Sequence, residues 1–250
     1  MLLSLPVELI LFILEYLTTE QLVKLRLVCK QLSEIALDRK LWKHVRLFNN
    51  NKILDSNVSN LLVDFSVLER LDLFRCKNIN GDFVKAINLN NCSRLKVQII
   101  SYTPFDNDNL CLMLKKTPLL HTLWINDCSN IDDNSVDIIC HLEHLKELKI
   151  GAANISVQGL LKIVSSCNSL CYLDTDGIVL DGNEFRELII RGHSLEILDI
   201  SGSIINDEDL LQCCEYLKQI KSLIIMDCVI STYVKERIQN KIPGLVIVTL

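Results

Sequence analysis

Aliphatic residues recur every 25 positions along most of this chain of 250 residues. The spacing holds over seven successive positions: Leu95, Leu120, Leu145, Leu170, Leu195, Ile220 and Leu245. Leu68 lies 27 residues before the first of them. A single compact domain has no reason to keep a constant spacing over such a length, whereas similar units that stack on one another do. The sequence therefore predicts an array of repeated units.

Each unit begins with the pattern L-x-x-L-x-L, in which x is any residue. Five units show it clearly: Leu68, Leu71 and Leu73; Leu120, Leu123 and Ile125; Leu145, Leu148 and Ile150; Leu195, Leu198 and Ile200; Ile220, Leu223 and Ile225. This is the opening of a leucine-rich repeat, in which alternate residues of a short strand point into a shared core.

The second half of each unit has apolar residues at helical spacing. One set is Leu89, Leu114, Ile139, Val164, Ile189 and Cys214, and a residue three positions earlier supports four of them: Cys111, Val136, Leu161 and Leu211. Offsets of three place side chains on one helix face. Polar residues that can cap these helices come before them: Asp106, Ser156, Asp181, Asn206 and Ser231. Because one unit cannot bury its apolar faces alone, the units must stack into a curved solenoid.

Three places depart from the pattern. Gln98 occupies an inward position of the unit at Leu95, unless a shift of one residue turns Val97 and Ile99 inward instead, and the sequence leaves both registers open. Thr175 replaces an inward aliphatic residue in a later unit. The last predicted strand, GLVIVTL, has no polar capping unit after it, so we expect its edge to be exposed or covered by a partner.

Residues 1–41 do not follow the 25-residue spacing. They are predicted to form short helices, one of which can be capped by Thr18 or Thr19. The repeat pattern returns in LWKHVRL, which includes Trp42. We therefore divide the chain into a helical module at 1–41 and a solenoid at 42–250.

The helical module has Leu-Pro near its start, Val-Cys-Lys in its middle and Trp directly after it. In full, the set is Leu5-Pro6, Ile10-Leu11, Ile13, Leu17, Leu22, Leu25, Val28-Cys29-Lys30 and Trp42. These residues resemble an F-box, the helical module that binds a Skp-type adaptor in cullin-based ubiquitin ligases. Leu32 is a departure, because many F-boxes have Trp at this position. The apolar stripe expected to bind the adaptor consists of Leu5, Pro6, Leu9, Ile10, Ile13, Leu14 and Leu17.

Cys76, Cys128 and Cys228 lie eight residues after the first aliphatic residue of their units. With this cysteine position, the chain resembles the F-box and leucine-rich-repeat family. The resemblance implies an α/β leucine-rich-repeat solenoid, with a curved parallel sheet on the concave side and helices on the convex side, preceded by a small all-α F-box module. It also implies that the F-box binds the Skp-type adaptor and cullin scaffold, and that the repeats bind the protein to be ubiquitinated.

The alternative is a leucine-rich-repeat scaffold without a ligase role, in which the N-terminal helices only cap the solenoid. The two hypotheses differ in one feature of the apolar stripe. Capping requires one buried apolar face, whereas docking an adaptor as well requires a second face that is exposed.

Residues between the inward leucines are predicted to form the substrate-binding concave face, because side chains alternate along a strand. The candidates are Phe74, Trp124, Tyr172, Asp174, Asp176, Ile197, Asp199, Ile224 and Met226. Aromatic residues are frequent anchors at interfaces. The three aspartates lie on adjacent predicted strands and favour a partner with a basic, partly apolar segment.

The composition excludes several other classes of function. A net charge of −5 provides no basic surface typical of nucleic-acid binding. The apolar start of the chain is interrupted by Glu8 and Glu15, so neither a signal peptide nor a membrane partner is predicted. The 11 cysteines include no C-x-x-C pair, and such thiols are typical of buried apolar residues in the cytoplasm or nucleus.

No catalytic, cofactor or metal site is predicted. His141 and His144, near Cys140, have a spacing that could bind a metal, but without a further ligand they are better explained as surface histidines at the end of a helix. The chain has no phosphate-binding loop and no G-x-S-x-G motif. A non-catalytic subunit is therefore expected.

Overall fold

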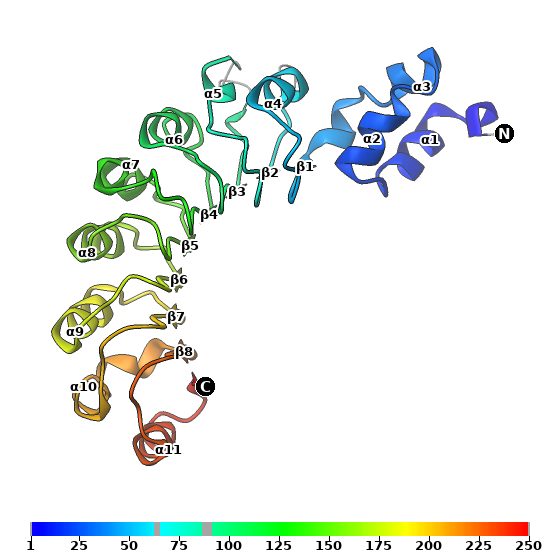
Figure 1. The fold of residues 1–250 in the computed structure, drawn as a ribbon. Coiled ribbons are helices and arrows are strands. Elements are labelled where there is room, and N and C mark those ends of the chain that lie inside the picture. The colour runs from blue at the N-terminus through cyan, green and yellow to red at the C-terminus, as the bar shows by residue number, and fades with distance from the viewer. Residues whose placement is uncertain (1, 63–65, 87–91, 250) are drawn as a thin grey trace.

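The computed structural model describes residues 2–62, 66–86 and 92–249. Within these residues nine short strands form one parallel sheet, whose strand order follows the sequence. The strands line the inner side of an arc and the helices its outer side, which confirms the predicted solenoid (Figure 1). The strands are β1 (His44–Arg46), β2 (Arg70–Asp72), β3 (Val97–Ile99), β4 (Thr122–Trp124), β5 (Glu147–Lys149), β6 (Tyr172–Asp174), β7 (Ile197–Asp199), β8 (Ser222–Ile224) and β9 (Val246–Val248).

Helices alternate with the strands on the convex side. They are α4 (Asp55–Leu62), α5 (Phe83–Ala86), α6 (Asn107–Leu114), α7 (Val136–Cys140), α8 (Val157–Ser166), α9 (Gly182–Arg191), α10 (Asp207–Gln212) and α11 (Thr232–Lys241), with short 3-10 helices η4 (Asp133–Ser135) and η5 (Tyr216–Gln219). All five predicted capping residues, from Asp106 to Ser231, accept a hydrogen bond from the backbone of their helix. The predicted helical position Leu89 lies outside the described residues.

The central residue of each strand points into the core. Neighbouring strands place these residues opposite one another in the order Val45, Leu71, Gln98, Leu123, Leu148, Leu173, Leu198, Leu223 and Ile247. The unshifted register at Gln98 is therefore the correct one, and this side chain is fully buried. Its Nε2 donates to Sδ of Met113 at 3.2 Å, but its Oε1 has no hydrogen-bond partner in the described part of the chain.

The other polar exception is compensated. Thr175 is also fully buried, and its hydroxyl donates to the backbone carbonyl of Asp199 at 2.9 Å. A polar group inside an apolar core is tolerated when it is hydrogen-bonded, so burying Thr175 costs little free energy of folding. Burying the unpaired oxygen of Gln98 costs more.

A residue with left-handed backbone geometry follows each of the first eight strands. At these positions φ lies between 53° and 85°: Asn49, Arg75, Tyr102, Asp127, Ala152, Gly177, Gly202 and Asp227. In five of them the backbone N–H extends the bonding between repeats, as when Asp127 donates to the Gly151 carbonyl at 2.9 Å; the other four are Asn49, Arg75, Tyr102 and Gly202. Six of the eight residues are not glycine, so the sequence alone did not indicate this turn.

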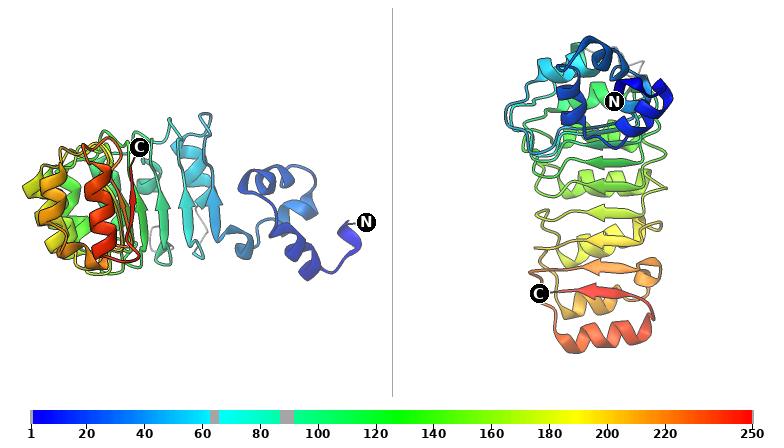
Figure 2. Two further views of the ribbon diagram at one scale, coloured as in Figure 1. Left: turned by 90° about the horizontal axis from the view of Figure 1, so that it is seen from below. Right: turned by 90° about the vertical axis from the view of Figure 1, so that its right-hand side faces the viewer.

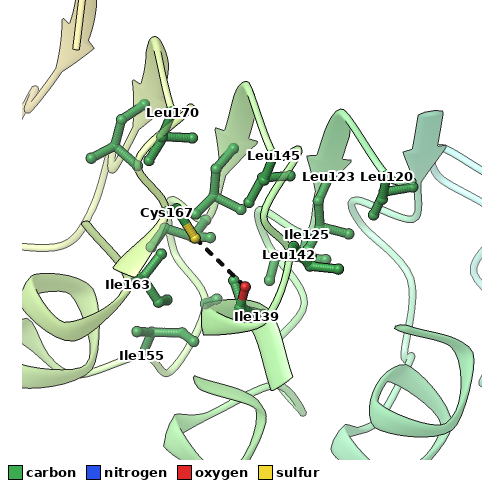
Figure 3. Packing of buried hydrophobic residues seen from close by; sticks show 14 of the residues in the cluster. Leu120, Leu123, Ile125, Ile139, Leu142, Leu145, Ile155, Ile163, Cys167 and Leu170 are labelled. Carbon is green, nitrogen blue, oxygen red and sulfur yellow. Dashed lines mark hydrogen bonds between the residues drawn. The ribbon is translucent and has the colours of Figure 1, made fainter. Parts of the chain in front are cut away.

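The buried aliphatic residues form one core that runs from Ile10 in the N-terminal module to Ile247 in β9. Figure 3 shows leucines from successive repeats packing in rows, with Sγ of Cys167 donating to the carbonyl of Ile139 at 3.6 Å. Burial raises the pKa of Cys167 to about 12 and that of Cys92 to about 11. These thiols are protonated at neutral pH and pack as small apolar groups.

Cysteines eight residues after the first aliphatic residue of a unit connect neighbouring repeats. Sγ of Cys76 donates to the carbonyl of Leu47 at 2.9 Å, and Sγ of Cys128 donates to that of Ile100 at 3.1 Å. Both carbonyls belong to the preceding unit. The recurring cysteine therefore gives a carbonyl of the preceding unit a thiol donor, which an aliphatic side chain could not supply, although the Ile100 carbonyl also accepts from the Thr103 hydroxyl at 2.6 Å.

The N-terminal module lies at one end of the arc, beyond β1 (Figure 2). It contains η1 (Leu2–Ser4), α1 (Val7–Leu14), α2 (Thr19–Leu25), α3 (Lys30–Ile35) and η2 (Arg39–Trp42). Thr18 caps α2 and forms a reciprocal capping box with Gln21, while the hydroxyl of Thr19 accepts from the backbone N–H of Arg46 at 2.9 Å. Trp42 is fully buried, and its indole N–H donates to the Ala36 carbonyl at 2.7 Å. The module therefore caps the first strand of the solenoid.

Candidate protein-interaction surfaces

Helix α1 has two apolar faces. One face carries Ile10 and Leu14, each about 1% exposed, and packs into the common core. The other faces solvent and continues past both ends of the helix with Leu5, Leu9, Phe12, Ile13 and Tyr16. We call this second face the α1 apolar face. It lacks a partner within the described residues, and exposed apolar patches of this kind mark interaction sites.

The predicted adaptor-binding stripe is divided between the two faces. Leu5, Pro6, Leu9 and Ile13 are exposed, and Leu17 is half-buried. Ile10 and Leu14 point into the core instead, because residues four apart lie on the same side of a helix. These two side chains hold α1 in place and cannot contact a partner in this structure. Sequence reasoning missed Phe12 and Tyr16, whose rings meet edge to face at 5.6 Å on the exposed side.

All nine predicted substrate-binding residues lie on or next to the outward side of the strands. Eight are half-buried and Asp176 is exposed. The strand register brings three sets of neighbours together: Tyr172 with Ile197; Asp174 with Asp199; and Asp199 with Ile224. The assignment of these residues to substrate binding stays a prediction.

Lys149 was not among the candidates, yet it organises the centre of the concave face. Its Nζ lies 3.3 Å from Oδ2 of Asp174, 4.8 Å from the ring centre of Trp124 and 5.0 Å from that of Tyr172. Burial acts to lower the pKa of Lys149, but its contacts with Tyr172 and Asp174 outweigh burial and raise that pKa. The indole N–H of Trp124 donates to Oε1 of Glu147 at 3.0 Å. The aromatic residues are thus held in fixed positions before any partner binds.

The acidic part of the concave face lies beyond Lys149. Asp199 accepts hydrogen bonds from the backbone N–H and the hydroxyl of Ser201, at 3.0 and 2.6 Å. Burial raises the pKa of Asp176, and the neighbouring carboxylates of Asp199 and Asp174 raise it further. These carboxylates repel one another, so a cation that binds among them relieves the repulsion.

A second aromatic cluster lies nearer the N-terminal end of the sheet. The guanidinium of Arg75 lies 5.1 Å from the ring centre of Phe74 and 4.9 Å from that of Tyr102, and the two rings meet at 5.3 Å. A hydrogen bond to Asp127 raises the pKa of Tyr102. Only Phe74 was predicted. Arg75 and Tyr102 occupy the left-handed turn after a strand, and the alternation along the strand does not predict where side chains of this turn point.

The histidines near Cys140 have local partners. Nδ1 of His141 is 2.6 Å from the carbonyl of Asp137, and His144 stacks on His121 with ring centres 6.1 Å apart. No three His, Cys, Asp or Glu side chains gather into a metal-binding cluster in the ranges that the structure describes. Nor does any helix in those ranges combine the length and the apolar character that crossing a membrane requires.

Comparisons with known proteins agree with the geometry. Residues 2–47 match the family model described as F-box-like. No curated protein matches the chain. Among solved structures, the chain is similar to a protein from Bacteroides fragilis with 16% identity and a TM-score of 0.53, over 81% of this chain and 64% of that one.

The chain is also similar to one in the crystal structure of the Rad7 and Elc1 complex in yeast. The identity is 15% and the TM-score 0.58, over 85% of this chain and 65% of that one. The chain thus spans just under two thirds of each of these structures, and at such low identity the likeness shows the fold alone. Residues 2–47 are therefore an F-box-like domain, and the chain as a whole shares its fold with these two solved structures.

Proposed function

We propose that the chain is the substrate-recognition subunit of a ubiquitin ligase built from a Skp-type adaptor, a cullin and an F-box protein. The observation that carries the proposal is the α1 apolar face, which lies within the F-box-like domain and remains exposed although the opposite face of α1 is buried. Capping the solenoid needs only the buried face. An apolar helix face is a common docking surface for a partner protein.

In this role the F-box-like domain holds the ligase scaffold and the concave face holds the protein to be ubiquitinated. The sheet that forms the concave face is continuous with β1, which packs on the F-box-like domain, and this fixes the distance between the two partners. The chain itself does no chemistry under this proposal. It raises the local concentration of the substrate near the conjugating enzyme and orients it there.

The similarity to a chain from the Rad7 and Elc1 complex supports a protein partner, because that fold occurs there in a complex of two proteins. The bond between Thr19 and the backbone of Arg46 favours a second candidate, a repeat scaffold whose N-terminal helices act only as a cap. The two candidates are distinguished by whether an adaptor binds.

The experiment is a pull-down of a purified Skp-type adaptor by the full chain, beside a known F-box protein as positive control. Wild type is expected to retain the adaptor. Leu5→Ala together with Pro6→Ala is expected to weaken retention while the melting temperature stays unchanged, because both residues are exposed. If wild type retains no adaptor while the positive control does, the ligase role is wrong and the scaffold candidate replaces it.

A further inference from the structure

A large cleft separates the N-terminal module from the first repeat. Its volume is about 1200 Å³, and its walls come from the end of α1, from α2, from η2, from β1 with the turn after it, and from α4. Pockets for small molecules usually measure roughly 300–1000 Å³. The cleft is therefore large enough for a segment of another protein.

The charged residues in the walls of the cleft are mainly basic. Five cationic side chains line it: Arg26, Lys40, Lys43, Arg46 and Lys52. None of the five forms an ion pair with a carboxylate of the described residues. Two carboxylates, Glu15 and Glu20, also line the cleft, and Glu20 is already paired with Lys24 at 2.7 Å. The positive charge of the cleft is thus largely uncompensated.

A titratable group in the cleft responds to this charge. Burial lowers the pKa of His44, and the neighbouring cations Arg46, Arg70 and Lys43 lower it further, against a smaller opposing effect of Glu69. The positive potential at the cleft contrasts with the acidic surface around Asp176 further along the sheet.

The cleft also exposes the free edge of the sheet. Residues of β1 alternate between the side paired with β2 and the open side, and Arg46 is on the open side, where Thr19 satisfies its N–H. By this alternation three more groups point to the open side: the carbonyls of His44 and Arg46 and the N–H of Phe48. None of the three has a hydrogen-bond partner within the described residues. An open strand edge is suited to pairing with an extended peptide.

We infer that this cleft binds an acidic, extended peptide segment of a protein partner, with carboxylates on the five cations and its backbone along the edge of β1. The segment belongs to the recruited protein, a point that rests on the proposed function. Because basic segments fit the surface at β6 and β7, a partner that used both sites would lie along the concave side with its acidic part next to the F-box-like domain. A nucleic acid fits less well, since the net charge of the chain is −5.

The test uses the full chain and a fluorescein-labelled peptide in which glutamate alternates with valine, read by fluorescence anisotropy. Lys43→Glu with Arg46→Glu reverses two exposed charges in the cleft, and Lys218→Glu with Lys241→Glu makes the same change at exposed positions at the other end of the arc. We expect the cleft variant to bind at least about tenfold more weakly and the control variant to stay within about twofold of wild type. Both should melt like wild type, because all four side chains are exposed.

Three further arms use the wild-type chain. A peptide with glutamine in place of glutamate should bind much more weakly, and raising the salt concentration should weaken the acidic peptide most. Saturating Skp-type adaptor should leave the peptide bound, because Tyr16 is the one residue of the α1 apolar face that lines the cleft and none of the five cations lies on α1. Oligo-thymidine should bind more weakly than the acidic peptide.

The inference is overturned if the acidic peptide does not bind, if the cleft and control variants lose affinity equally, or if the glutamine peptide binds as well. It is also overturned if the adaptor displaces the peptide, which would assign the cleft to the adaptor, or if oligo-thymidine binds more tightly. Failure of the proposed function has a separate readout, since it appears as absence of adaptor binding by the wild-type chain whatever the peptide does.

Discussion

The F-box-like domain and the solenoid differ in how they treat apolar side chains. Among the described residues, 11 of the 22 exposed large apolar side chains lie between positions 2 and 41, although this is the smaller part of the chain. In the solenoid the inward leucines are almost completely buried, because each repeat covers the next. The solenoid therefore buries its inward apolar side chains by itself, whereas the helical domain leaves apolar side chains exposed on its surface.

The difference arises from geometry. A three-residue strand in a stack has two neighbours that cover its inward side chain on both sides. A helix at the end of the stack has a neighbour on one side only, so any apolar residue on its other side is exposed. Charging an inward residue of the solenoid should thus cost folding, whereas charging the α1 apolar face should cost binding.

The largest effect is expected from Leu148→Asp. This side chain is fully buried between Leu123 and Leu173 of the adjacent strands, so an unpaired charge there disrupts at least two repeats. We expect the free energy of unfolding to fall by more than about 4 kcal/mol, measured by circular dichroism during thermal and urea unfolding. Ile204→Asp is the matched control, because Ile204 is 74% exposed, and it should melt like wild type. A Leu148 variant as stable as this control would contradict the shared core.

Much of the solenoid could be predicted from the sequence, because its signals are periodic. The inward residues, the helix caps such as Asp181 and Ser231, and the final strand all follow from spacing and residue type. The register at Gln98 could not be predicted, since a one-residue shift offers two apolar side chains in its place. Only the pairing of β3 with both neighbours decides it.

The interaction surfaces could be predicted only in part. The outward pattern placed Trp124 and Asp174 correctly on the concave face, but spacing does not show that Lys149 bridges them. The stripe on α1 was too wide, because a list of leucines does not reveal which side of a helix meets the solenoid. The basic cleft depends on residues from five separate elements, so no local pattern indicates it.

An intermediate effect is expected from Trp124→Ala on substrate binding. Trp124 holds the ammonium group of Lys149 and is itself held by Glu147, so it is an ordered anchor in the middle of the concave face. We expect a loss of about 1–2 kcal/mol in binding free energy for a verified substrate, measured by titration calorimetry. Tyr233→Ala, an exposed aromatic change on α11, should leave the affinity unchanged. If both variants bind like wild type, the substrate binds elsewhere.

A smaller effect, in the stabilising direction, is expected from Gln98→Leu. The change removes the unpaired Oε1 from the core and restores the aliphatic row between Leu71 and Leu123. We expect the free energy of unfolding to rise by about 1 kcal/mol in urea denaturation. Thr175→Val should be nearly neutral, because the Asp199 carbonyl keeps its bond from the Thr175 backbone N–H at 2.9 Å. A destabilised Gln98 variant would show that the amide contributes more than its unpaired oxygen costs.

The smallest effect concerns pH. Because the pKa of Asp176 is raised, this carboxylate gains a proton at a higher pH than an ordinary aspartate as the solution is acidified. As the pH is lowered, affinity for a lysine-rich probe peptide should therefore begin to fall at a pH above the range in which an ordinary aspartate titrates. Fluorescence anisotropy measured across pH would show this. Asp176→Asn should bind the probe more weakly at neutral pH and lose this early part of the pH dependence. Identical profiles for the two proteins would remove Asp176 from the cationic site.

The most direct test of the central claim is calorimetric titration of a Skp-type adaptor into variants that carry the same substitution in the two regions. Leu9→Asp with Ile13→Asp charges the α1 apolar face, and Val179→Asp with Ile204→Asp charges aliphatic residues of the solenoid that are at least as exposed. We expect adaptor binding by wild type and the solenoid variant, loss of at least about 2 kcal/mol of binding free energy in the α1 variant, and equal melting temperatures for all three. Equal adaptor affinity of the two variants would contradict this expectation.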